Sequence, residues 1–120
     1  LNALQQKKLH PYHNTARKQE PHGTKSAAAA YLLYAPKNKI LNPAGEWNEG
    51  KIISKNKKVE HWLNGVKVVS YKRGSKDFLK KKAVTKFKND KNYGEFEKGH
   101  IMLTDHNDLV YFRNIKIREL

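Results

Sequence analysis

Alternating apolar and polar positions in the middle of the chain predict a series of β-strands. Residues 47–54 carry spaced apolar side chains, and residues 59–63 alternate apolar and polar ones with the two-residue period of a strand. Asn64-Gly65 favours a type I′ hairpin turn, because both of its central residues take positive φ. Residues 66–71 form the return strand, and Asn56-Lys57 is the candidate for the preceding turn.

The pattern changes over residues 75–88, where apolar residues recur at near-helical spacing. Ser75 is suited to cap a helix, and Asp77 lies in its first turn, where negative charge is favourable. These residues predict one short amphipathic helix, with the lysines at 80–82 mostly on its outer side.

The remaining segments give divided signals. Residues 100–106 alternate and predict a strand, and residues 109–117 predict the last strand, with a bulge near Asn114 where the parity slips. Residues 26–36 combine four alanines, which favour a helix, with aromatic and leucine positions that favour a strand, so both interpretations stay open. Residues 1–25 are polar and show no period, and we expect them to be irregular.

These elements predict an all-β sandwich or jelly roll with one short helix inserted near residues 75–88. A length of 120 residues suits one domain, in which residues 26–120 form the sandwich portion and 1–25 the irregular N-terminal region. The absence of Cys excludes disulfides, thiolate metal sites and a Cys nucleophile. The chain also lacks an apolar stretch long enough for a membrane-spanning helix.

The charge of the chain suggests polyanion binding. It has 25 Lys+Arg against 11 Asp+Glu, which gives a net charge of +14. Lysines on phosphates would supply sequence-independent affinity for nucleic acid. However, the basic residues are mostly lysines spread along the chain, and the aromatic residues form no RNA-binding signature. A solvated basic surface explains the same pattern, so nucleic-acid binding is the least favoured of the functions considered.

Three segments in order carry a resemblance to a known family. They are Gly45-Glu46-Trp47-Asn48, His61-Trp62-Leu63-Asn64-Gly65, and the stretch 99–117, which reads GHIMLTDHNDLVYFRNIKI. Together they resemble the C-terminal half of the 3-keto-disaccharide hydrolase family. The resemblance implies a concanavalin A-like jelly roll and action on a carbohydrate, a 3-keto-glycoside. It also implies a secreted or periplasmic protein in a bacterium.

The chemistry implied by the resemblance needs a base and a group that stabilises an enolate. A ketone at C3 acidifies the proton on C2, and the enolate can then expel the group on C1 before water adds back. His106 is the candidate catalytic base, with Asp105 beside it, and a divalent metal ion or an Arg is the candidate stabiliser. The structural alternatives are a turn-capping role for His106 and an Asx turn at Asp105.

Four residues are candidates for binding the substrate. Trp62 points away from the core face of its strand, where it could stack on a sugar or be covered by a loop. His100 and Thr104 share a face of their predicted strand, and Asn64 either contacts substrate or serves the hairpin turn. The family usually carries Gln at the position of Thr104, which weakens the assignment of that residue.

Two further polar residues are assigned structural roles. His61 shares the parity of Val59 and Leu63, so we expect it to face the core and to be hydrogen-bonded. Arg113 lies on the last strand, where we expect a structural ion pair.

The sequence therefore supports three functions. The first is a domain that cleaves 3-keto-glycosides, the second a non-catalytic carbohydrate-binding jelly roll, and the third a basic module for nucleic acid or another polyanion. Because the family domain is longer than this chain, we expect an open or partial sandwich. Exposed strand edges and apolar faces would then favour oligomerisation.

Overall fold

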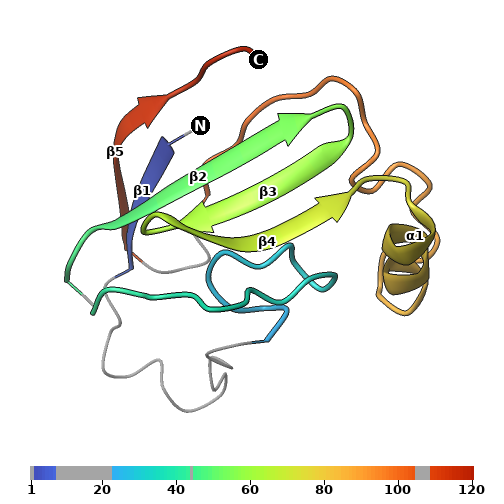
Figure 1. Cartoon of the computed structure of the whole chain (residues 1–120), viewed down its shortest axis with the longest axis horizontal. Helices are drawn as coiled ribbons and strands as arrows, with labels where there is room; N and C mark the ends of the chain where they lie inside the picture. Colours follow the sequence, from blue (N-terminus) through green and yellow to red (C-terminus); the bar gives the residue numbers. More distant parts are fainter. Residues whose placement is uncertain (1, 8–22, 44, 105–108) are drawn as a thin grey trace.

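The computed structural model describes residues 2–7, 23–43, 45–104 and 109–120, and for residues 2–7 only the backbone. The chain forms one five-stranded antiparallel sheet with the order β4-β3-β2-β1-β5 (Figure 1). The elements are β1 (Asn2–Lys7), β2 (Asn48–Lys55), β3 (Lys58–Leu63), β4 (Val66–Lys72), α1 (Lys76–Ala83) and β5 (Val110–Lys116).

Two tight turns set the register of β2, β3 and β4. Asn56 and Lys57 have φ of 49° and 65°, and Asn64 and Gly65 have φ of 48° and 80°. Positive φ at both central residues is the requirement of a type I′ turn, whose twist matches that of the flanking strands. Both predicted turns are therefore confirmed.

The last strand contains the predicted bulge. Arg113 pairs with Leu4 of β1, and Lys116 pairs with Asn2. Two residues therefore lie between the paired positions in β5 but only one in β1, and Asn114 has a φ of 53°. An extra residue in one strand of an antiparallel pair defines a β-bulge. The parity slip in the sequence thus located the bulge correctly.

Three sequence predictions need correction. The region 1–25 was expected to be irregular, yet Asn2–Lys7 is a strand between β2 and β5. Residues 100–104 were expected to be strand and are coil, although they alternate apolar and polar side chains. The segment 26–36 is neither helix nor regular strand but a series of turns with one isolated bridge between Ala30 and Tyr34.

The helix α1 forms where its capping residue predicts. The Ser75 hydroxyl accepts a hydrogen bond from the amide of Phe78 at 3.2 Å, and Asp77 lies in the first turn. Phe78 is 2% exposed and stacks on Tyr71 of β4, with 5.9 Å between the ring centroids. The helix lies beyond the end of β4 (Figure 1), and the buried side chain of Phe78 anchors it there.

One face of the sheet is covered by the segment 23–43. Tyr34 of this segment stacks on Tyr71, with 4.8 Å between ring centroids, and the Lys37 amide donates to the Val68 carbonyl at 2.8 Å. Because β4 is an edge strand, this last bond also occupies part of its exposed edge. The buried hydrophobic core consists of Leu33, Val59, Leu63, Val68, Val69 and Phe78.

The fold is a partial sandwich, as expected. Ile52 lies opposite His61 on the face that carries the core, yet it is 46% exposed, and Ile115 and Ile117 at the β5 edge are 44% and 69% exposed. The described apolar positions of β2 and β5 are thus only partly covered. That these exposed apolar positions favour oligomerisation stays a prediction. Among the described residues, no helix combines the length and apolar character that crossing a membrane requires.

His61 lies on the core face, as its parity predicts. Its Nδ1 lies 2.9 Å from the Ala28 carbonyl oxygen, and its ring packs edge-on to Tyr71 with centroids 5.9 Å apart. Burial lowers the pKa of His61 below 6.5, more than the bond to the carbonyl raises it. The neutral imidazole with a proton on Nδ1 suits this position.

We expect Gly94→Ala to destabilise the protein more than Gly65→Ala. Both glycines have positive φ, 71° and 80°, which costs an alanine about 1–2 kcal/mol. A Cβ at Gly94 would also lie 2.9 Å from the ring of Phe78, whereas nothing lies within 4 Å of one at Gly65. Overpacking against a buried ring adds about 1–3 kcal/mol, measurable by chemical denaturation. Equal losses in the two variants would contradict the packing described here.

We expect His61 to make the protein less stable in mild acid. The folded state resists protonation of His61, so the unfolded state binds more protons and the free energy of unfolding falls as the pH drops through the ordinary histidine pKa of about 6.5. His61→Gln should flatten this dependence in denaturation curves. The control is His100→Gln, which replaces an exposed histidine and should keep the wild-type slope. A wild-type slope in His61→Gln would refute the prediction.

Candidate functional site

The predicted catalytic pair, Asp105 and His106, lies outside the described residues. Both assignments therefore stay predictions. His100 and Thr104, on the approach to this pair, are exposed residues of the coil that follows the helix. The shared strand face that placed these two side chains together in the sequence analysis does not form.

Asn64 is held in a hydrogen-bond network that joins the β3–β4 turn to the start of β2. Its Oδ1 accepts from the amide of Glu49 at 2.8 Å, and its Nδ2 donates to the Ile40 carbonyl and to Asn48 Oδ1, both at 2.8 Å. Asn48 Oδ1 also accepts from the amide of Asn42 at 2.8 Å. Both Nδ2 hydrogens are engaged, which gives Asn64 a structural role; its contact with substrate stays a prediction.

Trp62 lies on the sheet face opposite the core. Its Nε1 donates to Glu60 Oε2 at 3.1 Å. Lys51 Nζ lies 4.5 Å and Lys67 Nζ 5.7 Å from the ring centroid, within range of a cation–π interaction. A sugar that stacked on this ring would meet the ammonium group of Lys51, so the surface around Trp62 is cationic rather than purely aromatic.

Glu60 holds two of the lysines on the same face. Its Oε1 lies 3.0 Å from Lys58 Nζ and 3.5 Å from Lys67 Nζ, and its side chain is 14% exposed. The hydrogen bond from Lys58, followed by the one from Trp62, lowers the pKa of the Glu60 carboxyl. Glu60 is therefore ionised at neutral pH and organises the centre of this face.

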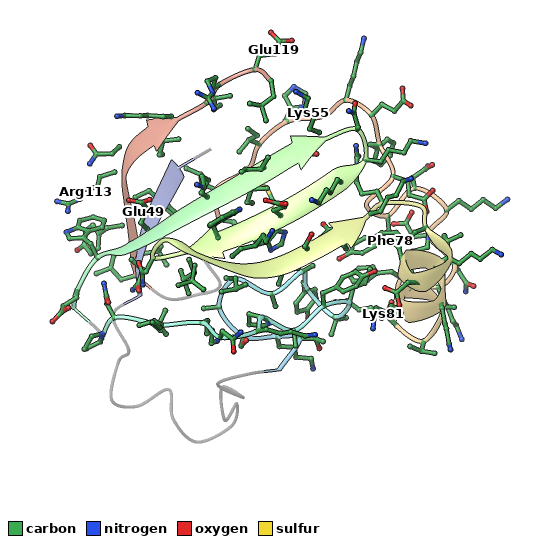
Figure 2. All side chains as sticks on the ribbon, viewed as in Figure 1. Glu49, Lys55, Phe78, Lys81, Arg113 and Glu119 are labelled. Carbon is green, nitrogen blue, oxygen red and sulfur yellow. The ribbon has the colours of Figure 1, made fainter. Side chains whose placement is uncertain are left out.

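Three lysines form a row across the sheet at the other end of the same face. Lys55 pairs with Lys58 across the β2–β3 turn, and Lys58 pairs with Lys72 of β4. A hollow of about 650 Å³ lies here, and Figure 2 shows Lys55 at this end of β2 and Glu49 at the other. The hollow is lined by Lys55, Asn56, Lys58, Ser70, Tyr71 and Lys72. We define Lys55, Lys58 and Lys72 as the lysine row.

The lysine row was not predicted from the sequence, although the signal for one of its pairs lies in a turn. A two-residue turn at Asn56-Lys57 requires Lys55 and Lys58 to be cross-strand partners. Counting back from the second turn would bring Tyr71 opposite Lys58. The register shift between His61 and Trp62 brings Lys72 there instead, and this shift was not predicted from the sequence. The lysines were treated as a charge spread along the chain, and their register was not followed.

Arg113 was expected to form an ion pair, and its described contact is of another kind. Its guanidinium carbon lies 4.0 Å from the centroid of the Trp47 ring, which precedes β2. Figure 2 shows Arg113 close to the start of β2, near Glu49. The stacked pair ties β5 to the segment before β2, which supports the structural part of the expectation.

The described residues offer several groups that can bind a ligand. Within residues 2–7, 23–43, 45–104 and 109–120, no three His, Asp or Glu side chains gather as a metal site would need. The face of β2–β4 opposite the core offers ammonium groups, the Ser70 hydroxyl, the Asn56 amide and the Trp62 ring. These groups can recognise an anionic or hydroxyl-bearing ligand.

Comparison with known proteins gives consistent matches. The profile of a family described as the 3-keto-alpha-glucoside-1,2-lyase-like domain matches residues 5–118. A 3-keto-disaccharide hydrolase of Bacteroides thetaiotaomicron is 31% identical over 106 residues, which cover 80% of this chain and 37% of that protein. A crystal structure from Parabacteroides distasonis, of a protein to which a glycosyl hydrolase function is attributed, has 36% identity and a TM-score of 0.70.

The crystal structure is matched over 76% of this chain and 42% of its own. This likeness supports the partial jelly roll, since the chain spans less than half the length of both relatives. The family profile, by contrast, extends over almost the whole chain, from β1 to the end of β5. The chain belongs to the family of 3-keto-alpha-glucoside-1,2-lyase-like domains.

Proposed function

We propose that this chain is part of an enzyme that cleaves 3-keto-glycosides by elimination followed by hydration. The observation that carries the proposal is the family match over residues 5–118, together with 31% identity to a 3-keto-disaccharide hydrolase. Because the chain covers 37% of that relative, the activity is proposed for the protein that contains the whole domain.

The proposed reaction is an elimination, which proceeds through an enolate, followed by a hydration. A base removes the proton from C2, which the neighbouring C3 ketone acidifies, and the electron pair of the C–H bond moves toward the ketone to give an enolate. The enolate then re-forms the ketone as a C1–C2 double bond develops and the C1–O bond breaks, releasing the aglycone as an alcohol after protonation. Water finally adds its hydroxyl to C1 and a proton to C2, which completes a net hydrolysis.

The proposal assigns the base to His106. The unperturbed pKa of a histidine lies close to neutral pH, where general base catalysis is most effective. Asp105 is proposed to assist at the same site, and Trp62, His100 and Thr104 to contact the sugar. Asn64 would act indirectly, because its hydrogen bonds hold the turn beside Trp62 and the start of β2.

A non-catalytic carbohydrate-binding domain is the second candidate function. The groups on the β2–β4 face favour it, because the described lining of the hollow includes three lysines, a hydroxyl and an amide beside Tyr71. The two functions differ in turnover: a binding domain would bind glycans without releasing an aglycone.

We expect His106→Gln in the intact protein to lower the rate of aglycone release about 10²–10⁴-fold, the usual contribution of general acid–base catalysis. The substrate is a 3-keto-glucoside with a chromogenic aglycone, and release is followed by absorbance. In deuterium oxide the wild-type product should carry deuterium at C2, because water returns the proton that the base removed.

Lys88→Gln is the control, since Lys88 is exposed and no proposed role depends on it; it should retain the wild-type rate. Product without deuterium at C2 would exclude the elimination, and an unchanged rate in His106→Gln would exclude His106 as the base. Glycan binding without release of aglycone by the wild type would support the second function instead.

A further inference from the structure

The lysine row places like charges directly opposite one another across three strands. Lys55 is the cross-strand partner of Lys58, and Lys58 is the partner of Lys72. Like charges in this arrangement destabilise a sheet. Glu60 compensates Lys58, but neither Lys55 nor Lys72 forms an ion pair with any described residue. Two exposed ammonium groups therefore flank the hollow without a described counter-charge.

The hollow beside the row has the groups that a sugar would use. The Ser70 side chain lies on the same sheet face as Glu60, its cross-strand partner, and Asn56 contributes from the turn. A hydroxyl and an amide can both donate and accept hydrogen bonds with sugar hydroxyls. Ammonium groups would bind a carboxylate or sulfate on the same sugar through charge-assisted hydrogen bonds.

We infer that the β2–β4 face binds an acidic carbohydrate, with Lys55 and Lys72 holding its carboxylate or sulfate groups at the hollow beside Ser70. This inference rests on the proposed function for the class of ligand, because a family that acts on glycosides makes a carbohydrate the partner of this face. It adds that the sugar, or the chain it belongs to, is anionic.

A nucleic acid is the less suitable partner for this face. Binding of single strands combines cations with aromatic rings on which bases stack. Lys51 Nζ lies 4.5 Å from the centroid of the Trp62 ring, where a base would stack. The Tyr71 ring beside the hollow is already stacked on Tyr34 and Phe78.

The test compares wild type with the double variant Lys55→Gln/Lys72→Gln by affinity electrophoresis at low salt. The probes are polygalacturonate, dextran sulfate, neutral dextran and a single-stranded oligodeoxynucleotide. We expect retardation of the wild type by polygalacturonate, dextran sulfate or both, and about tenfold weaker binding by the double variant, as expected for two exposed charge contacts. Neutral dextran should retard neither protein.

The matched control is Lys80→Gln/Lys88→Gln, which removes the same charge from exposed positions on α1 and after it. It should bind within about twofold of the wild type, because these lysines lie off the β2–β4 face. Retardation by polygalacturonate identifies a carboxylate as the recognised group, and retardation by dextran sulfate alone identifies a sulfate; either result supports the inference.

Three results would overturn the inference: equal weakening in the two double variants, no retardation by either acidic glycan, or tighter binding of the oligodeoxynucleotide through the same two lysines. The probes carry no ketone, so the result does not depend on turnover. A failure to cleave a 3-keto-glucoside would refute the proposed function without affecting this measurement. An absence of glycan binding would leave the deuterium experiment intact.

Discussion

The two-residue turns of the β2–β3–β4 ladder are the constraint on which the rest of the structure depends. A turn of this length sets the pairing of the residues next to it, and that pairing matters because moving one residue along a strand sends every side chain to the other face. Asn56-Lys57 and Asn64-Gly65 thereby fix that Val59, His61 and Leu63 face the core. The same register sends Glu60 and Trp62 to the opposite face and pairs Lys55 with Lys58, and the register shift between His61 and Trp62 in the β3–β4 pair then brings Lys72 opposite Lys58.

The sequence predicted these hairpins because their information is local. Positive φ at Asn64-Gly65 is a property of two neighbouring residues, and so is the Ser75 cap of α1. The position of β1 is not local. Its sequence, NALQQK, has little apolar alternation, and it is a strand because it completes backbone hydrogen bonds between β2 and β5. Pairing that depends on distant strands has no signature in the segment itself.

The segment 100–104 shows the opposite failure. Ile101 and Leu103 alternate with polar or flexible neighbours as a strand would, yet both are exposed in coil, at 55% and 40%. Alternation selects a strand only where another strand supplies hydrogen bonds and a covered face. The residues of the candidate site differ in the same way. Trp62 and Asn64 were placed correctly because they belong to a hairpin whose turn is encoded locally. The predicted grouping of His100 with Thr104 was wrong because it depended on a strand that does not form.

The two faces of the ladder differ because one is closed by packing and the other is organised by charge. On the core face, the segment 23–43 supplies the Tyr34 ring, which stacks on Tyr71, and the Ala28 carbonyl, which accepts a hydrogen bond from His61. Burial there lowers the pKa of His61 and keeps it neutral. On the opposite face Glu60 sits among several lysines and neutralises those within its reach. Lys55 and Lys72 form no ion pair with another described residue, and charges farther away are screened by salt over about 8 Å at physiological ionic strength, so an anion from solution can supply the compensation. A sheet face arranged in this way is more stable with an anion than without one, and this links the energetics of the fold to the kind of ligand it can hold.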